Sequence, residues 1–259
     1  MGIGDEIMVT GEVRKLALAK PGIRVAIRDA RRPDWHRWHV IWNGNPHIAR
    51  PGTPYDVMLE NAPGHRPYIE AKMTRSWIWR AYEPTPGELF LDERELSYGQ
   101  LAKKCIVIQP FIKASASPNK RWPLEFWQEL VERRPTWNWL QVGDGTEPKL
   151  SGVAFVQTPS FRDACGILRG ADMLVSQEGG LHHAAAALGT PAVVIFGGFI
   201  SPKVTGYASQ RNLYAESEQH PLGCGSRTPC FHCHRAMLSI KPNTVLEHME
   251  AIFDEHRSR

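Results

Sequence analysis

The sequence predicts an α/β protein whose C-terminal half is a Rossmann-type domain with helices on both faces of a parallel sheet. From residue 105 onward, short apolar runs rich in β-branched residues alternate with segments of helical period. A stretch rich in proline, glycine and charge, residues 84–104, precedes the first run and marks a boundary. We therefore expect a smaller, looser α/β domain at residues 1–100 and a larger domain at residues 101–259.

The C-terminal elements follow from this alternation. Strands are expected at residues 105–110, 137–143, 152–158, 172–177 and 191–197. Helices are expected at residues 123–134, 160–171, 180–189 and 241–257. Ser160, followed three residues later by Asp163, has the pattern of a helix N-cap, and Gly189 has that of a helix stop. Strands that alternate with helices of this length pair in parallel.

The N-terminal half is less regular. Residues 4–20 have a pattern compatible with a helix, and residues 24–29 and 38–43 predict strands. Residues 76–82 fit a helix or a strand equally well. Many of the 20 prolines fall in residues 46–87, which predicts long surface connections.

The composition is that of an ordinary globular protein. Of 259 residues, 42% are hydrophobic and 22% charged. No apolar run approaches the ~20 residues that span a bilayer, and the first residues lack the pattern of a signal peptide. We expect a cytoplasmic protein. An odd number of cysteines, five, argues against a disulfide framework in such a protein.

The charge is mildly basic and uneven. The net charge of +4 suits an anionic ligand. Residues 20–50 carry seven Lys or Arg against two Asp, with Trp and His among them. A solvated strand-loop face is the favoured interpretation, and a surface that binds phosphates or stacks bases is the alternative.

The segment Ser-Gln-Glu-Gly-Gly-Leu-His-His, residues 176–183, lies where a strand passes into a helix. Ligands of parallel α/β sheets bind at this edge, and a helix N-terminus favours phosphate. Gly179 and Gly180 allow a ligand close to the backbone, Glu178 can accept bonds from sugar hydroxyls, and His183 can reach a phosphate. The alternative is a tight turn with Glu178 as a helix cap.

Beyond these local arguments, the segment at residues 176–197 resembles the C-terminal signature of glycosyltransferase family 9, the ADP-heptose:lipopolysaccharide heptosyltransferases. Ser176, Gly180, His183 and the Gly-Thr-Pro at 189–191 match it in register. Glu178 and Gly179 depart, because the family has Asp and Thr there. Residues 115–130, 140–150 and 224–245 resemble further family segments, and Gly-Ile-Gly-Asp at residues 2–5 resembles its opening motif.

The resemblance implies a GT-B fold, two Rossmann-like domains facing a cleft, with the N-terminal one reduced. It assigns the donor phosphate to Lys120, the nucleoside to Glu147, and the general base to Asp5. Capping of the first helix is the alternative role of Asp5. Ser115 and Ser117 are candidate hydroxyl donors to the diphosphate.

The function implied is inverting transfer, without a catalytic cofactor, from a nucleotide-diphosphate sugar to an acceptor hydroxyl. The sugar is a heptose or a hexose. The acceptor is a glycan or lipopolysaccharide, reached peripherally at the inner membrane face. Two alternatives stay open: a modified base in DNA as acceptor, favoured by the basic aromatic segment, and a non-catalytic nucleotide-sugar-binding module.

Three cysteines cluster at Cys224, Cys230 and Cys233, followed directly by His234. With His234, or with His232, they suit a tetrahedral structural zinc or iron site. Three reduced thiols in a loop are the alternative. The sequence leaves the oligomeric state open.

Overall fold

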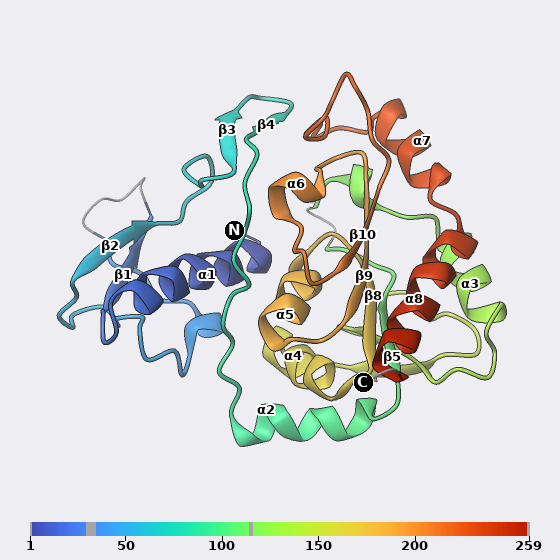
Figure 1. The fold of residues 1–259 in the computed structure, drawn as a ribbon, viewed down its shortest axis with the longest axis horizontal. Helices are drawn as coiled ribbons and strands as arrows, with labels where there is room; N and C mark the ends of the chain where they lie inside the picture. The colour runs from blue at the N-terminus through green and yellow to red at the C-terminus, as the bar shows by residue number, and fades with distance from the viewer. Residues whose placement is uncertain (1, 30–34, 114–115, 258–259) are drawn as a thin grey trace.

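The computed structural model describes residues 2–29, 35–113 and 116–257. The N-terminal part of the chain lies beside a larger C-terminal part, and the chain crosses between them along the segment after β4 (Figure 1). Among the described residues, no helix combines the length and the apolar character needed to cross a membrane.

A six-stranded parallel sheet forms the centre of the C-terminal part. Its order is β10-β9-β8-β5-β6-β7. The strands are β5 (Ile106–Gln109), β6 (Trp139–Gly143), β7 (Ala154–Gln157), β8 (Met173–Gln177), β9 (Ala192–Gly197) and β10 (Arg211–Tyr214). The five strands expected here are confirmed, whereas β10 was not predicted. The chain order reverses between β5 and β8, and such a switch point places a ligand at the carboxyl ends of these strands.

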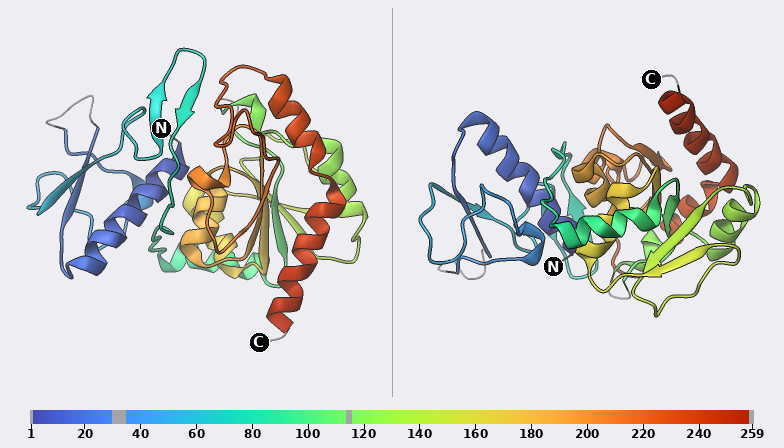
Figure 2. Two further views of the ribbon diagram at one scale, coloured as in Figure 1. Left: turned by 45° about the horizontal axis from the view of Figure 1, so that its top comes forward. Right: turned by 90° about the horizontal axis from the view of Figure 1, so that it is seen from below.

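Helices cover both faces of this sheet, as Figure 2 shows. Those of the C-terminal part are α3 (Leu124–Glu132), α4 (Phe161–Gly170), α5 (Gly180–Leu188), α6 (Pro202–Thr205), α7 (Phe231–Ser239) and α8 (Pro242–Arg257), with the short η3 (Pro118–Lys120). Along β8, Leu174 packs into the core on the α4 and α5 side, and Met173 and Val175 pack into the opposite core under α3 and α8. The four helices expected here are confirmed, and Ser160 and Gly189 cap as predicted.

The N-terminal part holds a long helix and short strands. They are α1 (Ile3–Ala19), β1 (Val25–Arg28), β2 (Val57–Glu60), β3 (Ile69–Lys72) and β4 (Trp77–Trp79). Strands β1 and β2 pair in parallel, and β3 and β4 form an antiparallel hairpin. The sheet of this smaller half is therefore much less extensive than that of the C-terminal half.

The strand expected at residues 38–43 is wrong. This segment contains the 3-10 turn η1 (Val40–Trp42). Val40 is exposed, whereas the consecutive Ile41 and Trp42 are both buried, a pattern that a strand with alternating faces does not produce. The ambiguous segment at residues 76–82 contains strand β4.

The connection between the two parts is partly helical, with α2 (Glu93–Ser97) and η2 (Tyr98–Ala102). Both pack on α4. Glu95 forms a buried ion pair with Arg162, 2.6 Å from Nε to Oε1. The domain boundary near residue 100 stays a prediction, since this segment is attached to the C-terminal part.

The N-terminal turn of α1 packs directly against α5. A Cβ atom at Gly4 would lie 2.5 Å from the imidazole of His183, so only glycine permits this approach. The contact brings the first turn of α1, with Asp5, to the edge of the sheet where the carboxyl ends of β5 and β8 lie.

Candidate active site

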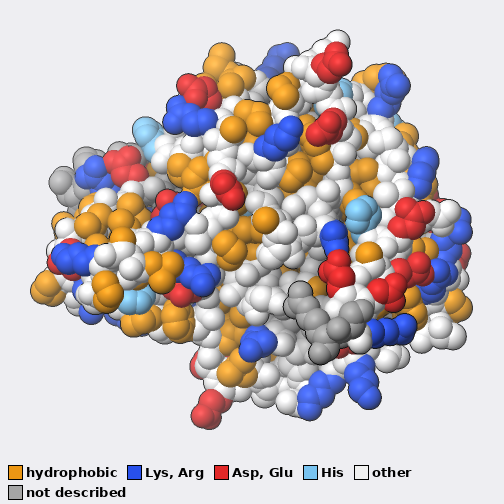
Figure 3. Space-filling model, viewed as in Figure 1, with side chains coloured by type: hydrophobic (Ala, Val, Ile, Leu, Met, Phe, Trp, Pro, Cys, Tyr) orange, Lys and Arg blue, Asp and Glu red, His pale blue; other side chains and the backbone are white. Residues whose placement is uncertain are grey.

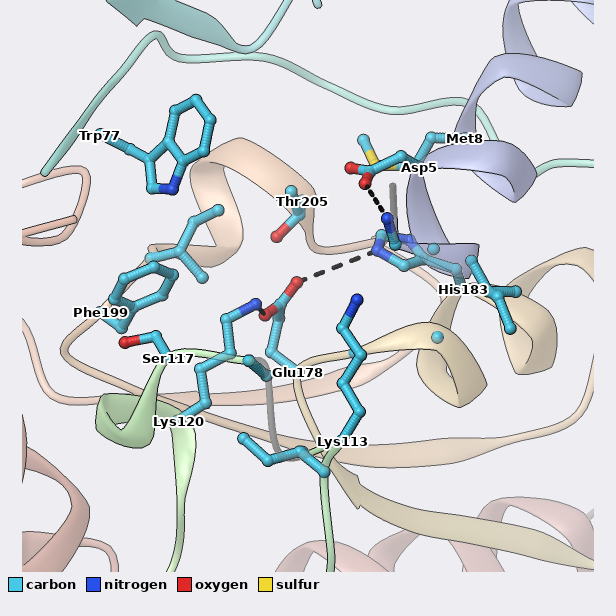
Figure 4. Close-up of a pocket in the computed structure, with 18 of the residues that line it drawn as sticks. Asp5, Met8, Trp77, Lys113, Ser117, Lys120, Glu178, His183, Phe199 and Thr205 are labelled. Atoms are coloured by element: carbon cyan, nitrogen blue, oxygen red, sulfur yellow. Dashed lines mark hydrogen bonds and ion pairs between the residues drawn. The ribbon is translucent and has the colours of Figure 1, made fainter. Parts of the chain in front are cut away.

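A pocket of about 630 Å³ lies at this edge and takes its walls from both parts of the chain. The C-terminal part contributes the end of β8, the start of α5 and η3, and the N-terminal part contributes the start of α1 and β4. Figure 4 shows Asp5 on one side of the pocket and Lys120 and Glu178 on the other. The structure thus brings together Asp5, Ser117, Lys120, Glu178, Gly179, Gly180 and His183, all predicted from the sequence.

Lys120 and Glu178 form an ion pair at the centre of the donor-side wall. Nζ of Lys120 bonds to Oε2 of Glu178 and also lies 5.1 Å from the ring centroid of Phe199. Burial would raise the pKa of the Glu178 carboxyl, but the ammonium of Lys120 brings that pKa below its usual range. Glu178 is therefore a buried carboxylate whose charge depends on its partner.

The two histidines of α5 are both buried and neutral. Burial lowers the pKa of His182, and it lowers the pKa of His183 further, helped by His182 and Lys120. His183 contacts the hydroxyl of Tyr207 through Nδ1 at 2.8 Å, and its Nε2 lies 3.9 Å from Glu178. His182 Nδ1 accepts the amide N–H of Gly179 at 2.9 Å. His182, and not Glu178, is therefore the residue that caps this helix.

Asp5 is held by three groups. Arg66 Nη1 lies 3.0 Å from Oδ1, and the Tyr68 hydroxyl donates to the same oxygen. Burial, followed by the charge of Asp5, raises the pKa of Tyr68 well above its usual value, so that this hydroxyl stays protonated. Oδ2 accepts the amide N–H of Gly2 at 3.0 Å. Asp5 thus does cap α1, and it also lines the pocket.

The remaining donor-side candidates are spread along the edge. Ser117 donates to the carbonyl of Ser226 at 3.1 Å, and Ser115 lies outside the described residues. Glu147 accepts the amide of Gly145 at 3.1 Å and lines a second pocket of about 960 Å³ with Asp144. Both pockets include Phe161 and Lys113, so Glu147 lies in a neighbouring compartment of the same edge.

The cysteine cluster lies near the start of α7. The Sγ atom of Cys224 is 3.9 Å from that of Cys230 and 3.0 Å from that of Cys233. The bond from Cys233 lowers the pKa of Cys224 to about 5. The histidine in this group is His232, whose ligand atom lies within 4.8 Å of the three sulfurs. His234 is not in this group, although it lines a third pocket beside Cys230 and Cys233, and its role as a ligand stays a prediction.

Several residues of the site escaped the sequence analysis. Arg66 and Tyr68 lie in an irregular, proline-rich stretch, and Tyr207 and Thr205 follow the last predicted strand. No motif or periodicity marks them. Their only signal is chemical, because a buried carboxylate or imidazole needs a polar partner.

Charges of both signs are interspersed over the face shown in Figure 3. Within the basic segment at residues 20–50, Arg28 pairs with Glu60 at 2.5 Å, and Arg37 pairs with Glu6 at 2.7 Å in the interior. Part of the positive charge in that segment is therefore neutralised within the protein.

The sheet order and a site shared by two unequal halves are those of a GT-B-type fold. In sequence, the chain is similar to lipopolysaccharide heptosyltransferase 1 of Pseudomonas aeruginosa, with 28% identity over 184 residues that cover 67% of this chain and 47% of that protein. The corresponding Escherichia coli protein is 26% identical over 128 residues, which cover 45% of this chain and 40% of that protein. The chain spans less than half the length of these curated relatives. No known family profile matches it.

Solved structures agree in fold. A glycosyl transferase family 9 protein of Veillonella parvula has a TM-score of 0.63 at 13% identity, covering 98% of this chain and 95% of that one. The iron-containing dodecameric glycosyltransferase TibC of E. coli has a TM-score of 0.64 at 13% identity, and the match covers 100% of this chain and 78% of that one. E. coli heptosyltransferase WaaC with ADP-2-deoxy-2-fluoro heptose has a TM-score of 0.57 at 14% identity, and the match covers 97% of each chain. The chain is thus similar in sequence and in fold to heptosyltransferases, as the resemblance of its motifs predicts.

Proposed function

We propose that this protein is an inverting glycosyltransferase that moves a heptose or hexose from an ADP-sugar to a hydroxyl of a lipopolysaccharide core glycan. One observation carries the proposal: Asp5 from one half and Lys120 from the other line the same pocket at the switch point of the sheet. The similarity to heptosyltransferases supports the choice of donor and acceptor.

In the proposed reaction, Asp5 removes the proton of the acceptor hydroxyl. Oδ1 accepts from both Arg66 and Tyr68, whereas Oδ2 accepts only the amide of Gly2, so the remaining lone pair of Oδ2 would receive this proton. The acceptor oxygen then forms a bond to the anomeric carbon while the bond from that carbon to the diphosphate breaks. Attack from the face opposite the leaving group inverts the anomeric configuration.

The leaving diphosphate is stabilised by the donor-side wall. The ammonium of Lys120 has three N–H donors, of which Glu178 occupies one, so the others can bond to phosphate oxygens. The first amides of α5 add the positive end of the helix dipole. The nucleoside would lie in the neighbouring compartment beside Glu147. In this scheme no catalytic cofactor takes part.

A structural zinc or iron ion at the cysteine cluster is part of the proposal. In a tetrahedral site with Zn–S bonds of about 2.3 Å, the sulfurs lie roughly 3.8 Å apart. The 3.9 Å between Cys224 and Cys230 matches this spacing, whereas the 3.0 Å between Cys224 and Cys233 would lengthen when an ion binds. Cys224, Cys230, Cys233 and His232 would hold the ion and tie the loop before α7 to its first turn. Elemental analysis of the purified protein tests this, and a folded protein free of both metals would contradict it.

The transfer itself is tested by incubating the protein with ADP-heptose and a lipopolysaccharide core oligosaccharide that lacks heptose. Mass spectrometry should find the oligosaccharide heavier by one heptose, together with free ADP. Replacing ADP-heptose by UDP- and GDP-hexoses tests the nucleotide. If no sugar donor is consumed, either by transfer or by slow hydrolysis, the enzymatic function is wrong and a binding module is the better account.

A further inference from the structure

Aromatic side chains form a wall of the pocket to which the proposed reaction gives no role. Trp77 and Trp79 come from β4, and Phe199 comes from the loop after β9. Trp79 donates its indole N–H to the carbonyl of Phe199 at 3.0 Å and meets that ring edge-on, with centroids 5.5 Å apart. Trp77 stacks beside Trp79 at 6.1 Å between centroids and 20° between planes. Trp79 is therefore fixed and supports Trp77.

The backbone of Trp77 is docked onto the C-terminal part of the chain. Its amide donates to the carbonyl of Gly225 at 2.9 Å, and the amide of Arg227 donates to the carbonyl of Arg75 at 2.8 Å. Gly225 has a φ of +62°, and a Cβ atom there would lie 2.0 Å from the carbonyl oxygen of Trp77. The approach thus requires glycine, and it holds the indole at the pocket rather than in the core.

Two polar atoms on this wall lack a hydrogen bond among the described residues. Thr205 is 3% exposed, and its Oγ1 makes no bond of ordinary geometry, although it lies close enough to Glu178 to favour the ionised carboxylate. Its carbonyl is fixed by His182 Nε2 at 3.1 Å. The indole N–H of Trp77 is the second such atom. Figure 4 shows the nitrogen edge of Trp77 and the Thr205 hydroxyl turned into the pocket.

We propose that Trp77, Phe199 and Thr205 form a subsite for a sugar ring. One face of a pyranose carries mainly C–H bonds and packs on the electron-rich face of an aromatic ring. Lys72 Nζ and Arg227 Cζ lie 5.8 and 5.7 Å from the Trp77 ring centroid, so a sugar that packs on Trp77 would displace one of these exposed cations. The hydroxyls at the ring edge bond to the indole N–H of Trp77 and to Oγ1 of Thr205, which satisfies a hydroxyl that is buried without a partner in the free protein. The inference rests on the proposed function, and the ring is that of the donor sugar or of the acceptor.

The test is isothermal titration with three ligands: ADP, ADP-heptose and a heptose-free core oligosaccharide. The variants are Trp77→Leu, Thr205→Val and Thr205→Ser, with Trp35→Phe as a control remote from the pocket. We expect ADP to bind all variants as it binds the wild type. One of the two sugar ligands should bind about tenfold more weakly to Trp77→Leu and to Thr205→Val, as when one well-packed contact is lost. The ligand that is affected identifies the ring, and Thr205→Ser should bind as the wild type does.

Melting temperatures separate this role from a structural one. Because Thr205 Oγ1 makes no hydrogen bond of ordinary geometry and only lies near Glu178, Thr205→Val should melt close to the wild-type temperature. A lower melting temperature, unchanged binding of both sugar ligands, or equal weakening of ADP would each overturn the subsite. A wild type that binds ADP but neither sugar ligand would also overturn it while leaving the nucleotide site intact. Failure of the wild type to bind ADP would contradict the proposed function itself.

Discussion

The two halves of this molecule differ in the size of the sheet that organises their cores. The C-terminal half is built on six parallel strands, and its core residues on β8 are fully buried on both faces. The N-terminal half has two short parallel strands, and beside apolar core residues such as Ile7 and Val25 it contains a buried polar network. There Glu6 accepts from Arg37 at 2.7 Å and from Asn61 at 3.0 Å. Apolar burial can be predicted from the pattern of a sequence, whereas a polar network between residues far apart in the chain can be identified only in the folded structure.

This difference extends to the site. Donor-side residues sit where strands of the large sheet end, so their place follows from topology. Asp5, on the other side, depends on a chain of contacts in which Arg66 bonds to Asn61 at 3.1 Å, and Asn61 bonds to Glu6. If the donor wall and the base are built independently, substitutions at one should leave the other intact.

The largest effect is expected at Asp5. Asp5→Asn should lower kcat about 10²–10⁴-fold, because a general base contributes that much, and should leave the affinity for ADP unchanged. Steady-state transfer assays and titration with ADP measure the two. Tyr68→Phe, which keeps the carboxylate, serves as the milder control. Transfer by Asp5→Asn at close to the wild-type rate would exclude Asp5 as the base.

The polar network of the N-terminal half should carry much of its stability. Arg37→Met leaves Glu6 buried without its cation, which typically costs about 3–5 kcal/mol of unfolding free energy. The exposed pair Arg80–Glu70 is the matched control, and Arg80→Met should change that free energy by at most about 1 kcal/mol. Urea denaturation measures both variants. Equal, small effects would mean that the network is dispensable.

Loss of Lys120 should weaken ADP binding. Lys120→Met should cost about 1–3 kcal/mol of binding free energy, as expected for a charge-assisted contact. It also leaves the Glu178 carboxylate buried alone, so Lys120→Met combined with Glu178→Gln should recover the thermal stability that the single variant loses, but not the affinity for ADP. An affinity that recovers with the stability would show that Lys120 acts only by neutralising Glu178.

The smallest effect concerns pH. Burial lowers the pKa values of His182 and His183 below 6.5, so both stay neutral in the folded protein while the unfolded chain protonates them. The unfolded state therefore binds more protons as the pH falls below about 6.5, and stability decreases in that direction. The pKa of Glu178 is also lowered, so its protonation adds a further loss of stability as the pH falls below 4.5, the usual pKa of a glutamate. Melting temperatures between about pH 7.5 and 5.5 should fall, and less steeply in His183→Gln. A flat profile would contradict buried neutral histidines.

The sequence predicts the C-terminal half well because its strands are continuous apolar runs and its helices have clear caps. Strand β10 was missed because its pattern, Arg-Asn-Leu-Tyr, is only partly buried at the sheet edge. At residues 38–43 the aromatic run predicts a strand, yet the segment forms the turn η1. There the indole N–H of the buried Trp42 donates to the carbonyl of Glu6 at 2.9 Å. The two failures differ in cause, because β10 is a partly buried edge strand, whereas Trp42 is positioned by Glu6 far along the chain.

The site shows the same division. Some site residues belong to motifs that are each contained in one short stretch of sequence, namely Lys120 in one stretch and Glu178, Gly180 and His183 in another. Arg66, Tyr68 and Thr205 act on the same pocket from irregular segments, and only the folded chain brings them there. The grouping of His232 with the three cysteines also required the structure, because the cysteine segment continues into helix α7 rather than staying a loop.

The measurement that tests the central claim most directly is titration of the wild-type protein with ADP, UDP, GDP and CDP, repeated with Lys120→Met. The account predicts that ADP binds with the highest affinity, raises the melting temperature by mass action, and binds about 10–100-fold more weakly to the variant. If none of the four nucleotides binds, or if ADP binds equally well without Lys120, the pocket at the switch point is not a nucleotide-sugar site.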